Sequence, residues 1–554
     1  MDKSPIPTTV PFSVDVEQFM KLILEVFYAK KEVFLREIIS NASDALDKAK
    51  AQSLSQHKPK PIIKITPDQE KQTLTIEDNG IGMTKQELIT NLGIIAKSTL
   101  TEALLDPGLD LSLVGQFGIG FYSVFLVADK VTVVSKSDQE EDKQNRWEST
   151  GASGTFSVVE DLDNPEKLTR GTRIILNLKK DCLQFLEEKV IKEIVKTYSR
   201  FISYPIELQV QRTLDNGETI KNFEWVNFSL KPLWARKPET ITNEEYSAFF
   251  KTIFWEQWEN PLGIKHILVE GQLDYKAILF VPRRAPFGLF QSQREKENMK
   301  LYVKKIFVLD GCSQLVPEYL NFIKGVVDSD DLPLNISRDS LLLSKIFKVM
   351  RRTIVKKCLE MIEDIAEDKE TYRQFYREFS HNVKLGVCQD ILNRHRLVDF
   401  LRYYSSKSGD EIISLKEYVS RMKEGQKEIY FLTGQSLTAV SSSPFTEELR
   451  RRGYEVLYLI DPIDEYVVQN LKDYDGKKMR DCSKDELYLE IAVEDSKRWV
   501  QYEGLCKLIK DFLGPKIDKA CVGTRMSQSP CALVTNENGW SAGLIRIYKA
   551  CSLV

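Results

Sequence analysis

Two polar residues inside an otherwise apolar helical pattern have the types and the spacing of a metal-assisted phosphoryl-transfer site. Glu37 and Asn41 stand four residues apart in the stretch FLREIISNASD, residues 34–44, and therefore one helical turn apart. An asparagine oxygen suits Mg²⁺, which takes a few oxygen ligands plus water. A carboxylate one turn away can polarise the attacking water. The pair can thus support hydrolysis of a phosphate anhydride.

The same spacing also fits a helix whose polar half simply faces water. Projected at about 100° per residue, the stretch places two polar stripes beside its apolar face. The stripes are Glu37, Asn41, Asp44 and Lys48, and Arg36, Ser40, Ser43 and Asp47. Periodicity alone does not choose between a catalytic stripe and a solvated one.

A glycine turn at the end of a predicted strand offers a place for a flat base. In EDNGIGM, residues 77–83, Asp78 can accept a hydrogen bond from the exocyclic amine of adenine. Gly80 permits the turn, and Gly82 lets the backbone approach the base closely. An ordinary Asp-Asn-Gly turn is the alternative interpretation.

A second glycine-rich segment, GQFGIGF at residues 115–121, precedes an apolar helical pattern. Bare backbone amides at the N-terminus of a helix can face phosphate. The segment lacks the GK[ST] ending of a Walker loop, and its G-x-x-G-x-G spacing differs from the dinucleotide fingerprint. Alone, such a glycine run is weak support for a phosphate site.

The elements that must position these residues follow from hydrophobic periodicity. Helical patterns cover 19–51, with a break near 28–31, then 85–95 and 184–202, and an apolar helix follows the second glycine segment. Strand patterns cover 62–66, 73–77, 131–135, 145–148, 154–159 and 172–178. Further on, strands are expected at 267–273, 275–280 and 301–309, helices at 340–380 and 383–404, and a strand, helix, strand unit at 428–461. The pattern predicts a multidomain α/β protein.

Composition narrows the possible partners and the compartment. The 554 residues include 78 Lys plus Arg and 81 Asp plus Glu, giving a net charge of -3 that does not favour nucleic acid. Nine cysteines without a CxxC pair and four histidines without ligand spacing argue against zinc and disulfide frameworks. No stretch approaches the roughly 18 apolar residues of a membrane span. We therefore expect a cytoplasmic protein with reduced thiols and no membrane partner.

Five segments of the first half carry a family resemblance: FLREIISNASDA, EDNGIGM, LGIIAKS, GQFGIGFYS and GTRIILNL. PLWARKP, RRAPFGLF, VVDSDDLPLNISRD and YVSRMKEGQKEIYF extend it through residue 431. Together they closely resemble the heat shock protein 90 chaperones of the bacterial high-temperature protein G type. The resemblance implies an N-terminal Bergerat-type α/β sandwich that binds ATP, an α/β middle domain and an α/β C-terminal dimerisation domain.

The resemblance also implies domain limits. The ATP-binding domain would span 1–212 with a mobile lid at about 97–114, and a short linker or hairpin would occupy 213–222. The middle domain, with client binding and a catalytic arginine loop, would span 223–490. The C-terminal domain at 491–554 looks short of the family's final dimerisation helices.

By motif match, the catalytic residues would be Glu37 as general base and Arg338 as the arginine that reaches the γ-phosphate. Asn41 would bind Mg²⁺ and Asp78 would anchor adenine. The remaining positions implied for ATP are Gly82, Met83, Asn91, Lys97, Gly118, Ile119, Gly120, Phe121 and Thr172. The chain departs from the family pattern at Ile94, Thr99 and Leu342, which leaves the lid kinetics and one polar contact open.

The function implied is that of an ATP-dependent chaperone of the stress response. ATP hydrolysis would drive a homodimeric clamp around unfolded or partly folded client proteins. A nucleotide-sensing, client-binding module with little turnover is the alternative, because the family hydrolyses ATP as a dimer and this C-terminus is short. A kinase or a DNA enzyme on the same ATP-site fold fits poorly, since no histidine sits in an H-[ED]-x-[RK] setting and the charge is near neutral.

Overall fold

The computed structural model forms two compact units. The first falls within 1–281, 291–316 and 323–355, and the second within 282–290, 317–322 and 356–554. The residues that the structure describes are 30–52, 60–93, 120–138, 143–150, 154–162, 166–213, 219–227, 232–254, 259–271, 274–285, 298–311, 314–330, 332, 345–484, 493–523, 525–536, 539 and 541–551.

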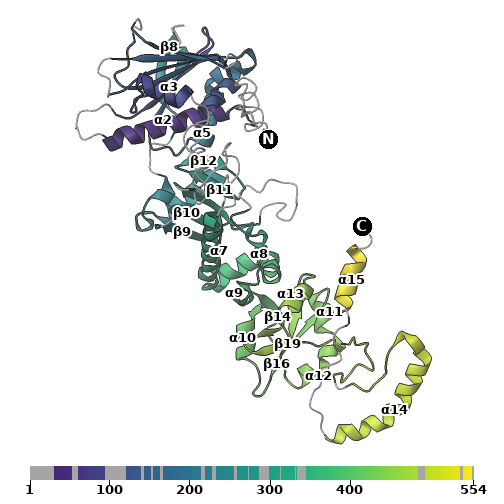
Figure 1. Cartoon of the computed structure of the whole chain (residues 1–554). Helices are drawn as coiled ribbons and strands as arrows, with labels where there is room; N and C mark the ends of the chain where they lie inside the picture. Colours follow the sequence, from purple (N-terminus) through teal and green to yellow (C-terminus); the bar gives the residue numbers. More distant parts are fainter. Residues whose placement is uncertain are drawn as a thin grey trace, which may run out of the picture. The chain divides into compact units, whose positions relative to one another are not determined.

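An eight-stranded sheet in the order β5-β4-β3-β6-β2-β1-β7-β8 dominates the first unit (Figure 1). Every neighbouring pair is antiparallel except β1 and β7, which run parallel. The strands are β1 (Ile63–Asp68), β2 (Thr73–Asp78), β3 (Ala128–Lys136), β4 (Asn145–Ser149), β5 (Phe156–Glu160), β6 (Gly171–Leu178), β7 (Ile206–Thr213) and β8 (Thr219–Trp225). Residues 219–222, where the sequence allowed a linker or a hairpin, begin strand β8 of this sheet.

Helices α2 (Val33–Gln52), α3 (Lys85–Gly93) and α5 (Glu188–Tyr198) lie beside this sheet (Figure 1). The apolar positions of α2 recur at three- and four-residue steps and enter one core with the inward side chains of the strands. Two 3-10 helices, η2 (Gly120–Leu126) and η3 (Lys180–Leu186), complete the layer. The core therefore holds α2 firmly against the strands that carry the glycine turns.

The apolar helix expected after the second glycine segment is a 3-10 helix in the described residues. Ser123 Oγ donates a hydrogen bond to the carbonyl oxygen of Gly120 at 2.6 Å. This side chain competes for a carbonyl that an α-helix would use in its own ladder, which favours the tighter turn. The expected apolar helix is therefore present, as a 3-10 helix of seven residues.

A second sheet of the first unit has the order β12-β11-β13-β10-β9. Its strands are β9 (Gly263–Val269), β10 (Tyr275–Val281), β11 (Met299–Val303), β12 (Ile306–Leu309) and β13 (Lys324–Ser329), covered by α6 (Asn243–Phe254) and the short η4 (Leu233–Ala235) and η5 (Pro238–Thr240). The single strand expected at 301–309 is a hairpin. It turns at Lys304 and Lys305, whose φ angles of 50° and 66° lie in the left-handed region.

The second unit contains α8 (Lys369–Gln389), α9 (Arg394–Asp399) and a six-stranded sheet in the order β15-β14-β17-β16-β19-β18. The strands are β14 (Arg402–Ser405), β15 (Ile413–Ser414), β16 (Glu428–Thr433), β17 (Leu457–Leu459), β18 (Asp473–Tyr474) and β19 (Lys477–Asp481). The helices between and after them are η6 (Glu318–Leu320), α10 (Leu415–Ser420), α11 (Leu437–Ser441), η7 (Pro444–Thr446), α12 (Glu447–Arg451), α13 (Asp464–Asn470), α14 (Val493–Leu513), η8 (Gly514–Lys516) and α15 (Ala542–Cys551).

The long helix expected at 340–380 is two helices, α7 (Lys345–Ala366) and α8. The first ends at Ala366, and Asp368 starts the second, because its side chain accepts the backbone N–H of Thr371 at 2.9 Å as an N-cap. The mixed α/β class is confirmed. Within the described residues, no helix has the length and apolar character needed to cross a bilayer.

Candidate functional site

Helix α2 buries three of the four polar residues at the start of its two polar stripes. Arg36, Glu37 and Ser40 are 2%, 2% and 3% exposed, whereas Asn41 is exposed. A merely solvated helix face would leave all four in water. The structure therefore rejects the solvated interpretation for Arg36, Glu37 and Ser40, and it leaves Asn41 accessible to a ligand.

Glu37 is held from two sides. Its Oε1 accepts hydrogen bonds from Arg36 Nε at 3.2 Å and Nη2 at 3.1 Å, and the Arg36 guanidinium lies 5.7 Å from the centre of the Tyr198 ring. Its Oε2 faces η2, where a Cβ added to Gly120 would lie only 2.5 Å away. A residue at position 120 must be glycine for this carboxylate to keep its place. The fold thus brings together two predicted site residues that are far apart in the sequence.

Asp78 ends strand β2 opposite Thr172 of β6 and is buried. Its Oδ1 accepts the backbone N–H of Gly80 at 2.8 Å, which shapes the turn that the sequence predicted. Burial raises the pKa of the Asp78 carboxyl to about 7, while backbone hydrogen bonds from Gly80 and Thr172 oppose that rise. A carboxyl with so high a pKa, at the bottom of a glycine turn, is typical of a ligand-binding position.

Two glycines let the segments around Asp78 approach each other. Gly82 has a φ of +69°, and a Cβ there would lie 1.9 Å from the carbonyl oxygen of Lys136. Gly171 has a φ of +116°, and a Cβ there would lie 2.0 Å from the carbonyl oxygen of Asp78. The sequence analysis placed Gly82 among the predicted site residues and did not include Gly171. Its position directly before Thr172, at the start of a strand, was the available signal.

Ser135, at the end of β3, joins the same segments and was also missed. Its Oγ accepts the backbone N–H of Met83 at 2.9 Å and lies 2.9 Å from Thr172 Oγ1 and 3.1 Å from the carbonyl oxygen of Gly171. The residue is fully buried. A serine in a strand has no distinctive pattern, so only the fold shows this role.

The remaining predicted positions are less closely grouped. Met83 packs partly buried against the core, and Asn91 is exposed on α3. Phe121 is buried, with its ring centre 5.7 Å from that of Trp147 in an edge-to-face arrangement. Lys97, Gly118, Ile119 and Arg338 lie outside the described residues, as do the lid at 97–114 and the departures Ile94, Thr99 and Leu342.

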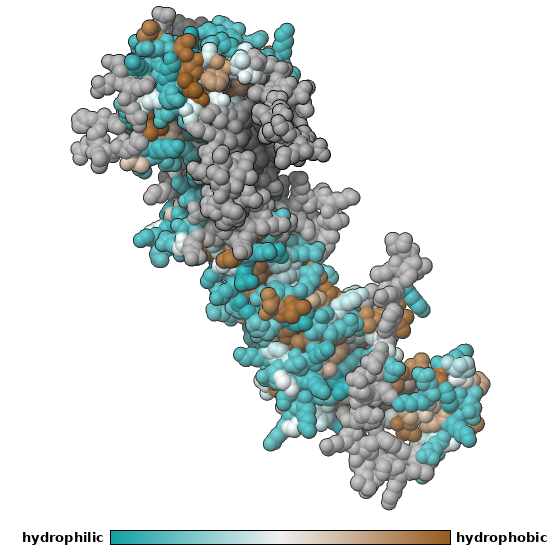
Figure 2. Space-filling view, in the orientation of Figure 1, coloured by the Kyte–Doolittle hydropathy of each residue, from teal (hydrophilic) through white to brown (hydrophobic). Residues whose placement is uncertain are grey.

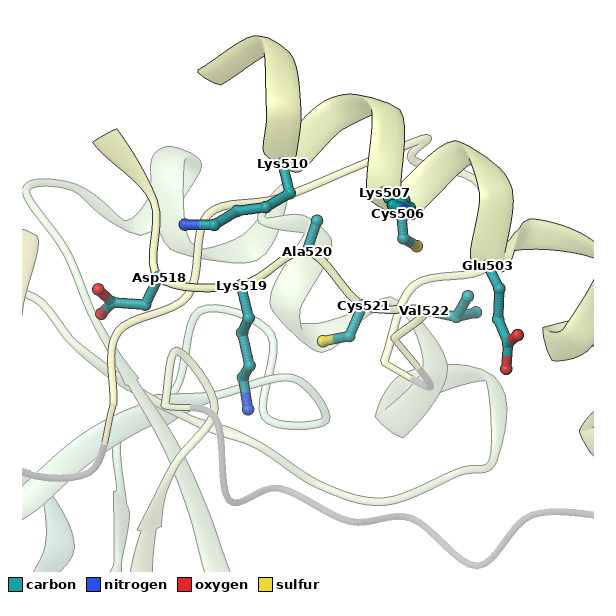
Figure 3. Close-up of a pocket in the computed structure, with 9 residues that line it drawn as sticks. All are labelled: Glu503, Cys506, Lys507, Lys510, Asp518, Lys519, Ala520, Cys521 and Val522. Atoms are coloured by element: carbon teal, nitrogen blue, oxygen red, sulfur yellow. The ribbon is translucent and has the colours of Figure 1, made fainter. Parts of the chain in front are cut away.

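A pocket of about 550 Å³ in the second unit lies apart from these residues in the sequence. Figure 3 shows Glu503, Cys506, Lys507 and Lys510 on helix α14, facing the segment from Asp518 to Val522. The Lys510 ammonium donates to the carbonyl oxygen of Gly514 at 3.3 Å and also to that of Ile517. These bonds fix the turn after α14, and no predicted site residue lines the pocket.

Comparison with known proteins agrees with the geometry. Residues 28–168 match the family described as "Histidine kinase-, DNA gyrase B-, and HSP90-like ATPase", and residues 215–554 match "Hsp90 protein". The chain is 41% identical over 584 residues to "Heat shock protein 90-5, chloroplastic" of Arabidopsis thaliana, covering 98% of this chain and 74% of the relative. It is 40% identical over 586 residues to "Heat shock protein 90-6, mitochondrial" of the same plant, covering 97% and 73%. The chain therefore belongs to the Hsp90 family and is an ATP-binding, ATP-hydrolysing chaperone.

Proposed function

We propose that Glu37, Asn41 and Asp78 are the centre of the ATPase site, and that its cycle opens and closes a clamp around unfolded or partly folded client proteins. The contact between Glu37 and Gly120 carries this proposal. It places a buried carboxylate against the last glycine of the expected phosphate loop. Arg36 orients that carboxylate through its side chain.

The residues at hand suit both a nucleotide and a divalent metal. Asp78 presents a buried oxygen to the adenine amine, in a turn fixed by Gly80 and Ser135. Asn41 is exposed one turn from Glu37, and its amide oxygen is of the kind that Mg²⁺ accepts as a ligand. When bound, Mg²⁺ would neutralise charge on the phosphates. Lys97, Gly118, Ile119 and Phe121 would hold the phosphates and base, and Arg338 would complete the site.

Exposed apolar side chains support a macromolecular partner. Helix α14 presents Tyr502, Leu505, Leu508, Ile509 and Phe512 on its surface, where Figure 2 shows brown side chains. Phe512 is 89% exposed, far more than a large apolar side chain usually is in a monomer. Client proteins and a second copy of the chain are the partners we propose, with neither nucleic acid nor membrane involved.

The proposal includes the domain limits and the compartment expected from the sequence. Residues 1–212 would bind ATP, 223–490 would form the middle domain, and 491–554 would belong to the C-terminal domain, although strand β8 (Thr219–Trp225) pairs with β7 and extends the ATP-binding sheet past residue 212. Free thiols at the described cysteines, three of them buried, support a reducing compartment such as the cytoplasm. Fractionation of cells that express the tagged chain tests this placement.

The central experiment replaces the proposed base. Glu37→Ala should keep ATP binding and lose ATP turnover, because the base acts on water rather than on the nucleotide. Asp44→Asn is the matched control on the same helix, since Asp44 pairs with Lys304 at 3.6 Å on the surface. Undiminished hydrolysis in Glu37→Ala would remove Glu37 from the role of base.

A further inference from the structure

A polar pocket of about 680 Å³ in the second unit lies between helix α8, strands β14 and β17, and the start of α13. Its volume is within the range of small-molecule sites. The residues that line it are Arg283, Glu370, Thr371, Arg373, Gln374, Tyr376, Arg377, Ser380, Lys384, Arg402, Tyr403, Tyr404, Asp410, Ile412, Tyr458, Ile460, Asp461 and Asp464.

Helix α8 gives this pocket a cationic mouth. Arg373, Arg377, Ser380 and Lys384 follow each other at steps of four, three and four residues, so they share one face of the helix. Arg373 and Arg377 are exposed, whereas Lys384 is buried. Two arginines one turn apart repel each other and slightly destabilise the helix. Arg377 Nε lies 3.4 Å from Glu378 Oε1, and Glu370 and Asp410 also line the pocket. An arginine has five N–H donors, so an anion at the mouth can still bind the guanidinium groups and reduce their mutual repulsion.

The floor of the pocket is already neutralised. The buried Lys384 ammonium lies 2.9 Å from Asp464 Oδ1 and 2.5 Å from Asp461 Oδ2. The same ammonium lies 5.4 Å from the centre of the Tyr403 ring, which helps to fix that ring. Lys384 therefore organises the floor, and the anion-binding capacity stays with the arginines at the mouth.

Two buried hydroxyls that line the pocket, those of Tyr376 and Tyr403, have no hydrogen-bond partner among the described residues, and the proposal uses Tyr403. Tyr403 is 4% exposed, and its Oη has no hydrogen-bond partner among the described residues. Burial raises the tyrosine pKa well above 10, so the hydroxyl stays protonated and can donate. A buried donor without an acceptor is costly, and native structures keep few of them. An acceptor atom of a bound molecule at this point would satisfy it.

We propose that this pocket binds a small planar organic oxyanion, with its anionic group at Arg373 and Arg377 and an acceptor atom at the Tyr403 hydroxyl. Tyr404, Tyr458, Ile412 and Ile460 also line the pocket, and aromatic and aliphatic side chains of this kind suit an organic ring. A guanidinium group can donate two parallel hydrogen bonds to two oxygens of a phosphonate or of a carboxylate. An aromatic phosphonic acid and an aromatic carboxylic acid therefore both have the required chemistry.

The test is titration calorimetry of the full chain with phenylphosphonate and with benzoate, in separate arms. Saturable binding is expected, and the probe that binds more tightly shows whether the pocket prefers a phosphonate or a carboxylate. The neutral analogue anisole should not bind. Saturating ADP should leave the affinity for the probe unchanged, because no residue of the proposed ATP site lines the pocket. Arg373→Gln combined with Arg377→Gln should weaken binding at least tenfold.

Tyr403→Phe gives the sharpest comparison. Since the Tyr403 hydroxyl has no partner among the described residues, its removal should leave the Tm unchanged or higher. It should lower the affinity for the probe about tenfold. Tyr418→Phe is the control: its hydroxyl donates to the carbonyl oxygen of Glu455 at 2.7 Å outside the pocket, so the Tm should fall and probe binding should persist. Equal affinity in Tyr403→Phe, in the arginine variant and in the unaltered chain, or no saturable binding, would mean that the pocket holds water only and would overturn the proposal.

Discussion

The carboxylate of Glu37 and the α-carbon of Gly120 are so close that no side chain fits between them. A Cβ at position 120 would meet Glu37 Oε2 at 2.5 Å and its carboxyl carbon at 3.3 Å. The flexible end of the glutamate would have to shift, because the backbone of η2 is held by the core beneath it. The position of the proposed base therefore depends on the absence of one methyl group.

Gly120→Ala should lower ATP turnover by roughly 10- to 100-fold, since a displacement of about 1 Å at a catalytic group costs that much. Nucleotide affinity should change far less. Steady-state hydrolysis and equilibrium binding of ADP measure the two effects. Gly504→Ala is the control, because a Cβ at Gly504 of α14 meets nothing within 4 Å. Full turnover in Gly120→Ala would show that Glu37 does not need its observed position.

Asp78 should make nucleotide affinity depend on pH near neutrality. Burial raises the pKa of its carboxyl to about 7, and the carboxylate accepts a hydrogen bond from the adenine amine more strongly than the acid does. Affinity for adenosine, which does not itself titrate in this range, should rise severalfold from pH 6 to pH 8. Asp78→Asn should bind weakly at every pH. A flat profile for the unaltered chain would contradict the assignment of Asp78.

The same group predicts the opposite trend for stability without ligand. Its pKa in the folded protein lies above the value of 3.8 expected in the unfolded chain, so the folded protein holds a proton that the unfolded chain releases. The resulting stabilisation is fully present below pH 4 and is lost as the pH rises through 7. Urea unfolding at several pH values should show this decline in the unaltered chain and lose much of it in Asp78→Asn.

Ser135 should act on nucleotide binding rather than on hydrolysis, because it fixes the turn at Met83 and the side chain of Thr172. Ser135→Ala leaves the Met83 N–H without this acceptor, at a cost of about 1–3 kcal/mol. ADP affinity should fall about five- to tenfold, with kcat at saturating ATP nearly unchanged. Ser135→Thr, which keeps a hydroxyl, should recover affinity. Ser149→Ala on β4 is the control, since the Ser149 hydroxyl donates to the carbonyl oxygen of Thr155 at 2.8 Å, at the opposite end of β4 from the residue that pairs with Ser135.

Arg36 should contribute to stability mainly by compensating a buried charge. Removing it in Arg36→Met leaves the buried Glu37 without its cation, and such a loss costs about 3–5 kcal/mol. The double variant Arg36→Met with Glu37→Leu should recover most of that loss. Hydrogen exchange of α2 in the full chain reports the effect. If the single and double variants exchange alike, the pair does not control the stability of this helix.

The sequence by itself determined the local features of this protein. The three- and four-residue apolar steps around Phe34 specify a helix, and the alternation before Asp78 specifies a strand that ends in a glycine turn. These patterns reflect the steric and solvation preferences of residues close together in the sequence, so they can be recognised without knowledge of the tertiary structure. The family motifs added the assignment of an ATP-hydrolysing chaperone, and the comparisons confirmed it.

Only the tertiary structure decided which polar residues are buried and which distant segments touch. Arg36 and Asp47 belong to the same polar stripe, yet the first is buried and the second is exposed. Ser135 and Gly171 gained their roles from strands β3 and β6 pairing beside the turn at Gly82. Such contacts join residues tens of positions apart. Their energy depends on packing and on the loss of water, and local periodicity contains neither.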